Sequence, residues 1–255
     1  MAPRRRRGIA ISATPAWPPR SLPRLFVKAP LGEGARVELD AAQANYLGNV
    51  LRMKEGAELL LFDGSSGEWL AQIAQAGKKR MALVVERCTR EAEVIPDVWL
   101  AFAPVKRSQT DWLVEKATEL GVARLIPVTT ARTVVDRVKL ERLQAIAIEA
   151  AEQCGRTRLP QIDEPISLSQ LLNRREARTL YFADEGGGAL AASAFKPGPA
   201  LILTGPEGGF TDEERAAIRA TPETVAISLG PRILRAETAA LAALATFMAL
   251  AGDWR

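Results

Sequence analysis

Four charged residues stand beside two glycine-containing stretches near the C-terminal end of this 255-residue chain. Glu207 lies in Leu-Thr-Gly-Pro-Glu-Gly-Gly-Phe at 203–210, and Arg232, Arg235 and Glu237 lie in Leu-Gly-Pro-Arg-Ile-Leu-Arg-Ala-Glu. Arginine can stabilise a developing negative charge, and a carboxylate can accept a proton or orient an arginine. Glycine lets the main chain take positive φ and approach a ligand closely. Together the two stretches form the candidate site of chemistry.

Each stretch follows a short apolar run, at 201–203 and at 225–229, which predicts a buried strand ending in a tight loop. Thr211 and Glu214 form a capping box, so a helix is expected from about Asp212. Two such strand–loop–helix units place their loops at one edge of an open α/β sheet, where ligands bind. Either loop alone is better explained as an ordinary turn, but the pair of loops with two arginines and two acids beside the glycines favours a site.

Histidine is absent from the whole chain, and this limits the chemistry. Ser-His and Cys-His nucleophiles are excluded, and a zinc site would be poorly supplied with ligands. The G-x-G-x-x-G fingerprint and the Walker lysine are also missing, which argues against a classical nucleotide-binding fold. Any reaction must use carboxylates, arginine or lysine, backbone groups or a cofactor.

Both glycine-containing stretches resemble the signature pair of the bacterial 16S rRNA (uracil-N3) methyltransferases, which belong to the SPOUT superfamily. Asp-Trp-Leu-Val-Glu-Lys-Ala-Thr-Glu-Leu-Gly-Val at 111–122 and Glu-Ala-Ala-Glu-Gln-Cys-Gly-Arg at 149–156 are similar to further stretches of the family. The resemblance runs from about Leu22 to the C-terminus. It implies a knotted α/β methyltransferase domain behind a small PUA-like β-barrel, with S-adenosylmethionine as cofactor and N3 of a uridine in 16S rRNA as target.

The resemblance also implies roles for the residues of the two stretches. Arg235 and Arg232 would steady the anionic uracil and its phosphate, and Glu237 or Glu207 would orient them. For Glu237, an acid in the first turn of a helix is an equally good explanation. The cofactor would be held by the residues of the two loops: Leu203, Thr204, Gly205, Pro206, Glu207, Gly208, Gly209, Leu229, Gly230, Ile233 and Leu234.

Two other functions remain open from the sequence. A ribose 2′-O-methyltransferase of the same superfamily would share the cofactor loops, although its relatives usually carry a Ser/Asn-bearing final motif in place of Glu237-Thr-Ala. A non-catalytic rRNA-binding assembly protein would keep the barrel and the arginines but lose the glycine loops. Because the loops are intact, an enzyme is favoured.

The chain divides into a basic arm at 1–21, expected to be disordered, a PUA-like domain at 22–92 and a methyltransferase domain at 97–255. Short apolar segments with turns between them, and a helix at 40–51 capped by Asp40, predict the barrel, whereas alternating strands and helices follow Pro96. Strands are expected at 98–103, 124–129 and 179–183. Helices are expected at 111–120, with Ser108 or Thr110 as cap, and at 137–154, ending at Gly155. Candidate contacts to rRNA phosphates are Arg24, Arg52, Lys54, Lys106 and Arg107, together with the Lys-Lys-Arg turn at 78–80.

Most of the net charge of +4 is local, because residues 1–24 hold six arginines and no acid. Cys88 and Cys154 are expected to be buried free thiols in a reducing cytosol.

No apolar run is long enough to span a membrane, so a cytoplasmic protein without membrane or metal is expected. The Ala-rich helix at 239–251 predicts burial on more than one face, and the resemblance places it at or near a homodimer interface.

Overall fold

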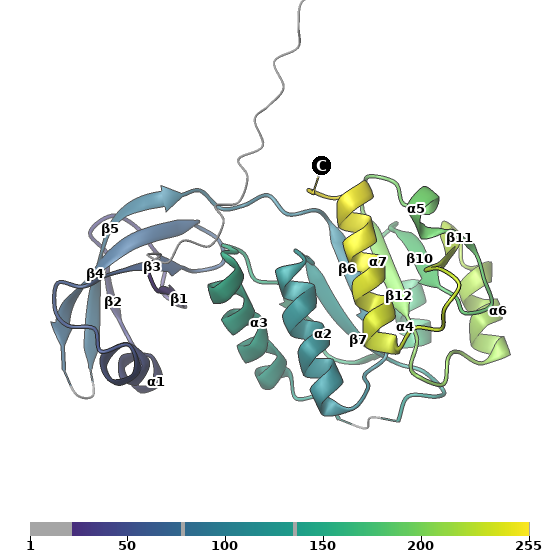
Figure 1. Ribbon diagram of the computed structural model, residues 1–255, viewed down its shortest axis with the longest axis horizontal. Coiled ribbons are helices and arrows are strands. Elements are labelled where there is room, and N and C mark those ends of the chain that lie inside the picture. The colour runs from purple at the N-terminus through teal and green to yellow at the C-terminus, as the bar shows by residue number, and fades with distance from the viewer. Residues whose placement is uncertain (1–21, 78–79, 135–136, 255) are drawn as a thin grey trace, which may run out of the picture.

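The computed structural model describes residues 22–77, 80–134 and 137–254, and it contains two domains side by side (Figure 1). The predicted arm at 1–21, together with Lys78 and Lys79 of the predicted basic turn, lies outside the described residues. In Figure 1 the smaller domain carries the N-terminal strands, and the larger one carries the parallel sheet with its helices.

The N-terminal domain is a mixed five-stranded sheet in the order β1-β3-β4-β5-β2, which forms a half-barrel. Its strands are β1 (Arg24–Phe26), β2 (Arg36–Glu38), β3 (Glu58–Phe62), β4 (Glu68–Ala76) and β5 (Met81–Arg90). Alternating residues of β3 and β5, with Leu47, fill its core. Asp40 caps helix α1 (Ala41–Asn45) through the amide of Gln43, as the sequence predicts. The predicted helix to Leu51 continues only as a π-helical turn, η1 (Tyr46–Val50).

The C-terminal domain is a parallel sheet in the order β11-β13-β10-β12-β6-β7-β8, and β9 also pairs with β7. The strands are β6 (Val98–Phe102), β7 (Arg124–Thr129), β8 (Gln161–Ile162), β9 (Ile166–Ser167), β10 (Thr179–Ala183), β11 (Ala189–Leu190), β12 (Ala200–Thr204) and β13 (Thr224–Ser228). Every residue of β6 and β12 is buried, as expected of central strands covered on both faces.

Helices cover the two faces of this sheet. The helices are α2 (Arg107–Glu119), α3 (Leu140–Cys154), α4 (Leu168–Asn173), α5 (Ala191–Ala194), α6 (Asp212–Ala220) and α7 (Ala236–Leu250). One hydrophobic core joins α2, α3 and α7 to one face, and a second joins α4 and α6 to the other. The chain passes from β12 through α6 to β13 on the far side of β10, and α7 then returns to pack on β12 and β6.

Local sequence signals gave several helix ends correctly and misplaced others. Thr211 and Glu214 form the predicted capping box of α6, and Gly155 ends α3 in the left-handed conformation. Helix α2 begins at Arg107, four residues before the predicted start, and its N-cap is Lys106. Thr110 was a candidate cap, but its hydroxyl instead bonds the backbone of Val105. The short β8, β9, α4, β11 and α5 were not predicted.

Both cysteines are free, as expected, but only one of them is shielded from solvent. Cys88 is exposed on β5, which corrects the prediction of two buried thiols. Cys154 is partly buried, and this burial raises the pKa of its thiol. Within the described ranges, no helix combines the length and apolar character needed to cross a membrane, and no cluster of three or more acidic or cysteine side chains is arranged to hold a metal.

Candidate active site

Three loops at the carboxyl edge of the parallel sheet enclose a cavity of about 220 Å³. They follow β10, β12 and β13, and the first turns of α7 close one side. The cavity is lined by Ala183, Asp184, Glu185, Gly187, Gly205, Pro206, Glu207, Gly209, Ile227, Ser228, Leu229, Gly230, Pro231, Arg232, Ile233, Leu234, Ala236 and Ala239. The structure thus brings both glycine-containing stretches into one site.

Two glycines of the β12–α6 loop are required by their surroundings. A Cβ atom on Gly205 would lie 2.7 Å from the ring of Phe210, which packs in the core below the loop. Gly209 has φ +69°, and its Cβ would collide with the carboxylate of Glu185. The loop can therefore follow this path only with bare backbone at both positions, and it exposes that backbone to the cavity.

The third loop, 184–188 after β10, was not among the predicted site residues. Asp184 is almost fully buried and pairs with Arg215 (2.6 Å) and Arg219 from α6. Gly188 passes so close to Ala226 of β13 that a Cβ would overlap its carbonyl. The sequence signal was the Gly-Gly-Gly run at 186–188 after a predicted strand, but strand order was needed to place it beside the other loops.

Eight of the eleven predicted cofactor residues line the cavity, and three do not. Leu203 and Thr204 are buried at the end of β12, where Leu203 belongs to the hydrophobic core. Gly208 faces Arg132, whose guanidinium donates to the Gly208 carbonyl at 2.6 Å. Ile233 lines the cavity but is 95% exposed. It therefore lies at the rim of the cavity and does not form an enclosed apolar wall.

The three predicted catalytic residues occupy different environments. Arg232 is exposed and lines the cavity. Arg235 is the N-cap residue of α7, and its exposed side chain makes no hydrogen bond or ion pair with the described residues. Glu237, in the first turn of α7, is 7% exposed, and its Oε2 is buried without a hydrogen-bond partner among the described residues. The structure shows no ion pair between Glu237 and either arginine within the described ranges.

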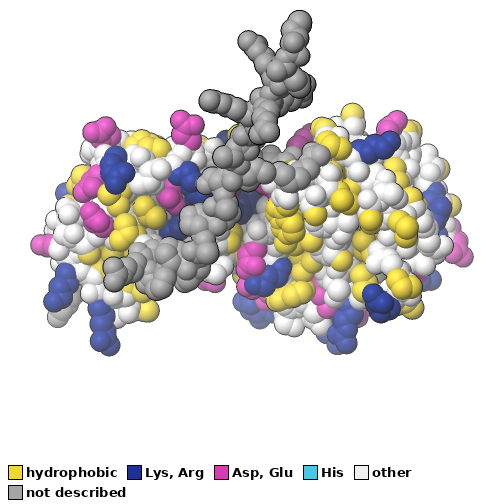
Figure 2. Space-filling model, turned by 45° about the horizontal axis from the view of Figure 1, so that its top comes forward, with side chains coloured by type: hydrophobic (Ala, Val, Ile, Leu, Met, Phe, Trp, Pro, Cys, Tyr) yellow, Lys and Arg dark blue, Asp and Glu magenta, His cyan; other side chains and the backbone are white. Residues whose placement is uncertain are grey.

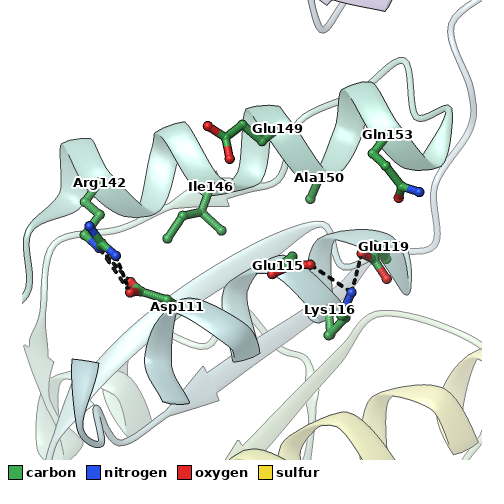
Figure 3. A pocket seen from close by; sticks show the side chains of 9 residues that line it. All are labelled: Asp111, Glu115, Lys116, Glu119, Arg142, Ile146, Glu149, Ala150 and Gln153. Atoms are coloured by element: carbon green, nitrogen blue, oxygen red, sulfur yellow. Dashed lines mark hydrogen bonds and ion pairs between the residues drawn. The ribbon is translucent and has the colours of Figure 1, made fainter. Parts of the chain in front are cut away.

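A wider cavity, about 620 Å³, lies between α2 and α3 and is shown in Figure 3. Its charged side chains are largely paired with one another: Lys116 bridges Glu115 and Glu119 (both 2.8 Å), and Arg142 binds Asp111. These ion pairs raise the pKa of Lys116. The cavity is built from helix side chains, away from the glycine loops, so we do not assign the reaction to it.

Arg24 is not a free phosphate contact, which corrects its predicted role. Its guanidinium donates to Glu68 (2.8 Å) and to the carbonyls of Ala151 (2.6 Å), Glu152 (3.0 Å) and Arg156 (2.7 Å). The side chain is 11% exposed and lies over the ring of Phe62. Its donor groups therefore serve the junction between β1 and the C-terminal end of α3, and not an RNA phosphate.

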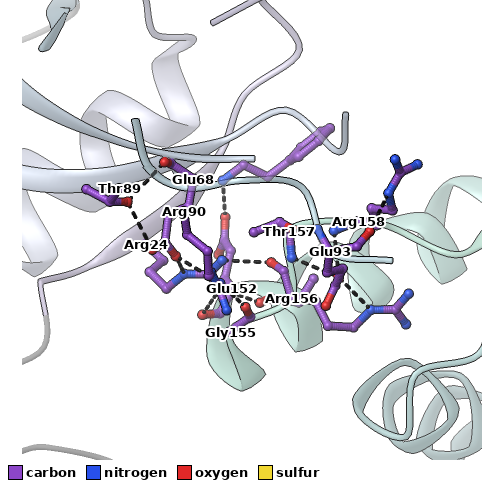
Figure 4. Close-up of polar contacts among 12 residues, drawn as sticks. Arg24, Glu68, Thr89, Arg90, Glu93, Glu152, Gly155, Arg156, Thr157 and Arg158 are labelled. Atoms are coloured by element: carbon purple, nitrogen blue, oxygen red, sulfur yellow. Dashed lines mark hydrogen bonds and ion pairs between the residues drawn. The ribbon is translucent and has the colours of Figure 1, made fainter. Parts of the chain in front are cut away.

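Figure 4 shows that this junction is a polar network between the domains. Glu152 accepts from the amide of Phe26 (2.9 Å), and burial raises the pKa of its carboxyl group. Glu93 accepts from the amides of Thr157 and Arg158, both at 2.9 Å. The stretch 149–156, to which the sequence assigned no individual roles, thus supplies the surface on which the N-terminal domain is fixed.

The other predicted RNA contacts that the structure describes, Arg52, Lys54, Arg80, Lys106 and Arg107, are exposed. Arg52 and Lys54 follow η1, where Tyr46 and Val50 are also exposed at 42% and 62%. Arg52 adopts φ +56°, an uncommon conformation for a residue other than glycine. Lys106 and Arg107 start α2 at the carboxyl edge of the parallel sheet. In Figure 2, Lys and Arg side chains appear on both lobes, including the lower margin of the larger one, with acids among them.

Family models identify the class of protein. A model described as an RNA methyltransferase domain matches residues 91–248, and one described as an RNA methyltransferase PUA domain matches residues 39–86. The fold and the site therefore define an RNA methyltransferase with a PUA-like N-terminal domain.

The ribosomal RNA small subunit methyltransferase E of Rickettsia conorii is 33% identical, over 87% of this chain and 93% of that protein. Its Bacillus subtilis counterpart is 31% identical over 86% and 92%. The crystal structure of the Neisseria gonorrhoeae enzyme of that name, bound to S-adenosyl methionine, superposes with a TM-score of 0.85 at 28% identity, covering 92% of this chain and all of that one. The chain belongs to the ribosomal RNA small subunit methyltransferase E family, which confirms both the resemblance and the expected fold class.

Proposed function

We propose that this protein transfers a methyl group from S-adenosylmethionine to N3 of a uridine in the 16S rRNA of the small ribosomal subunit. The observation that carries the proposal is the cavity at the carboxyl edge of the sheet, where both signature loops meet in a member of this family. Ligands of α/β sheets bind at such edges.

The residues present fit the cofactor. Gly205 and Gly209 leave bare backbone where any Cβ would fill the loop, so main-chain groups are available to the adenosyl part. Ile227, Leu229 and Leu234 supply apolar sides to the cavity. When bound, S-adenosylmethionine supplies an electrophilic methyl group, and the remaining task for the chain is to hold the uracil and remove its N3 proton.

Arginine at the rim provides the electrostatic part of the reaction. As N3 loses its proton, negative charge spreads to O2 and O4, and a guanidinium beside them stabilises it. Arg232 lines the cavity, and Arg235 at the start of α7 has an exposed side chain without a partner in the part of the chain that the structure describes, so both are available for this role. Glu237 lies two residues from Arg235, and its Oε2 is buried without a hydrogen-bond partner among the described residues, which supports a role in orienting an arginine in the complex.

We also infer that the protein acts in the cytoplasm as a homodimer, with α7 at or near the two-fold interface. Within the described chain, α7 already packs on α2, α5, β6 and β12. Its Thr238, Ala242, Ala245 and Ala249 remain partly or fully exposed at spacings of three and four residues, so they share one helix face. Small residues on one face permit close approach of a second helix.

The proposed function is tested by methyl transfer from labelled S-adenosylmethionine to 30S subunits from a strain lacking this protein, followed by mass spectrometry of the digested rRNA. We expect one N3-methyluridine. A 2′-O-methyl product would assign the protein to the other enzyme class, and tight subunit binding without product would favour an assembly protein.

Arg235→Ala tests the role of the arginine. We expect transfer to be lost while the Kd for S-adenosylmethionine, measured by calorimetry, stays within about twofold, because Arg235 is outside the cavity lining. Arg174→Ala removes an equally exposed arginine from the opposite edge of the same sheet and serves as the control. Undiminished turnover by Arg235→Ala would remove Arg235 from the mechanism.

A further inference from the structure

A second pocket, of about 140 Å³, lies at the same edge of the parallel sheet, where α2 and α3 begin. It is formed by the β6–α2 connection and by the end of the β7–α3 connection. Its lining residues are Pro104, Val105, Arg107, Thr110, Asp111, Arg137, Val138, Lys139, Arg142 and Leu143. Arg137 and Lys139 do not line the cavity formed by the glycine loops.

The floor of this pocket is apolar. Pro104, Val105 and Leu143 are buried, and Val138 packs partly buried against the same hydrophobic core. The hydroxyl of Thr110 is occupied by the backbone of Val105, with which it makes both of its hydrogen bonds (3.2 and 3.0 Å). Such a surface suits the flat, largely apolar face of a nucleobase better than a small ion.

The rim of the pocket is positively charged. Arg107, Arg137 and Lys139 are exposed, and their side chains make no hydrogen bond or ion pair with any residue in the described ranges. Arg142 is different, because it is held by Asp111 through three hydrogen bonds of 2.6 to 3.1 Å (Figure 3). Three cations without a partner among the described residues therefore surround the apolar floor, and the one acid among the described lining residues, Asp111, is paired with Arg142.

The pocket is connected to the active site through one loop. The β7–α3 connection that contributes Arg137 and Lys139 also contains Arg132, which binds the carbonyl of Gly208 in the β12–α6 loop (2.6 Å). The amide of Ala131 in the same connection donates to Glu214 of the α6 capping box (2.7 Å). Because β12, β6 and β7 are neighbours in the sheet, the two sites lie along one edge.

We infer that this pocket binds a nucleotide of the RNA substrate that flanks the target uridine, with its base on the apolar floor and its phosphates on Arg107, Arg137 and Lys139. Apolar or aromatic contact with an unstacked base, combined with cations along the backbone, is a common way to hold single-stranded RNA. The inference rests on the proposed function, and it adds Arg137, Lys139 and the floor residues to the substrate site.

The test compares Arg137→Ala/Lys139→Ala with the control Arg174→Ala/Lys196→Ala. Both double variants remove two exposed cations from the same domain, but Arg174 and Lys196 precede β10 and β12 at the opposite edge of the sheet. Initial rates of methyl transfer are measured against the concentration of unmethylated 30S subunits at several KCl concentrations. Calorimetry gives the Kd for S-adenosylmethionine.

We expect the pocket variant to raise the KM for subunits by about tenfold or more and to reduce the salt slope of log(kcat/KM) by about two, one for each lost phosphate contact. The control should match the wild type, and the cofactor Kd should not change. Val138→Ser, which alters the floor without removing a charge, should raise KM while leaving the salt slope as in the wild type.

An unchanged KM in the pocket variant, an equal effect in the control, or a weakened cofactor Kd would each overturn the inference. If the wild type transfers no methyl group, the proposed function itself has failed. In that case the inference is tested by cosedimentation of the same variants with 30S subunits. Equal binding by the pocket variant and the wild type would overturn the inference.

Discussion

Gly208 and Gly209 are adjacent in the β12–α6 loop, but a side chain would meet different surroundings at the two positions. At Gly209 the backbone is left-handed and a Cβ would collide with Glu185 across the cavity. At Gly208, φ is ordinary and the nearest atom to a Cβ is the flexible Arg132 side chain at 3.4 Å. Comparing substitutions at these two positions therefore tests whether the loop needs glycine because of backbone conformation and steric collision, or only because it lies at the site.

We predict that Gly209→Ala weakens S-adenosylmethionine binding at least about tenfold and destabilises the fold by roughly 1–3 kcal/mol, because the strained conformation and the collision both move the loop. Gly208→Ala should bind the cofactor nearly as the wild type does. Calorimetry and thermal unfolding measure the two effects. Equal losses in both variants would contradict the steric explanation.

At the scale of elements, the C-terminal end of α3 is the part of the C-terminal domain that is hydrogen-bonded to strand β1 of the N-terminal sheet. Arg24 joins β1 to three carbonyls at this end, and Glu152 accepts the amide of Phe26. Burial removes water from the carboxyl group of Glu152 and disfavours its charged form, so its pKa is raised above the ordinary value. A raised pKa means that the folded protein binds this proton more tightly than the unfolded chain does.

We therefore predict that Glu152→Gln is more stable than the wild type at pH 7, because the amide keeps an acceptor for Phe26 without burying a charge. The stability linked to the raised pKa is fully present below the unfolded pKa and is lost as pH rises through the folded value. The difference between variant and wild type should thus shrink as pH falls through the folded pKa, and it should be smallest below about 4.5, the ordinary pKa of a glutamate.

Thermal unfolding of both proteins between pH 4 and pH 8 measures this difference. Glu33→Gln, at an exposed position of the N-terminal domain, is the control and should give little change at any pH. A less stable Glu152→Gln variant at pH 7, or a gap that widens on acidification, would show that the ionised carboxylate stabilises the junction.

At the scale of the whole molecule, the proposed dimer depends on the face of α7 that the chain itself leaves partly uncovered. We predict that the wild type sediments as a dimer at micromolar concentration. Ala242→Arg should sediment as a monomer, because a long charged side chain prevents close helix approach at this face. The control Ala216→Arg, on an exposed position of α6, should remain dimeric. A monomeric wild type would refute the dimer.

Much of the architecture was determined by local sequence patterns. Buried apolar runs such as 98–102 and 201–203 became central strands, and Asp40, Thr211 and Gly155 ended or began helices as predicted. These features depend on backbone dihedral preferences and on burial, which neighbouring residues set. The two signature loops were also recognisable from neighbouring residues, because their glycines and prolines follow apolar runs. The family resemblance then predicted their function.

The tertiary structure decided which distant residues meet. Arg24 looked like a free cation, yet its partners include a carbonyl 127 residues away. The loop at 184–188 joined the site because β10 lies between β12 and β13, and Arg107 meets Arg137 and Lys139 only where α2 and α3 begin side by side. Sequence spacing carries no record of strand order or helix packing, because these are set by long-range contacts that minimise exposed apolar surface over the whole chain.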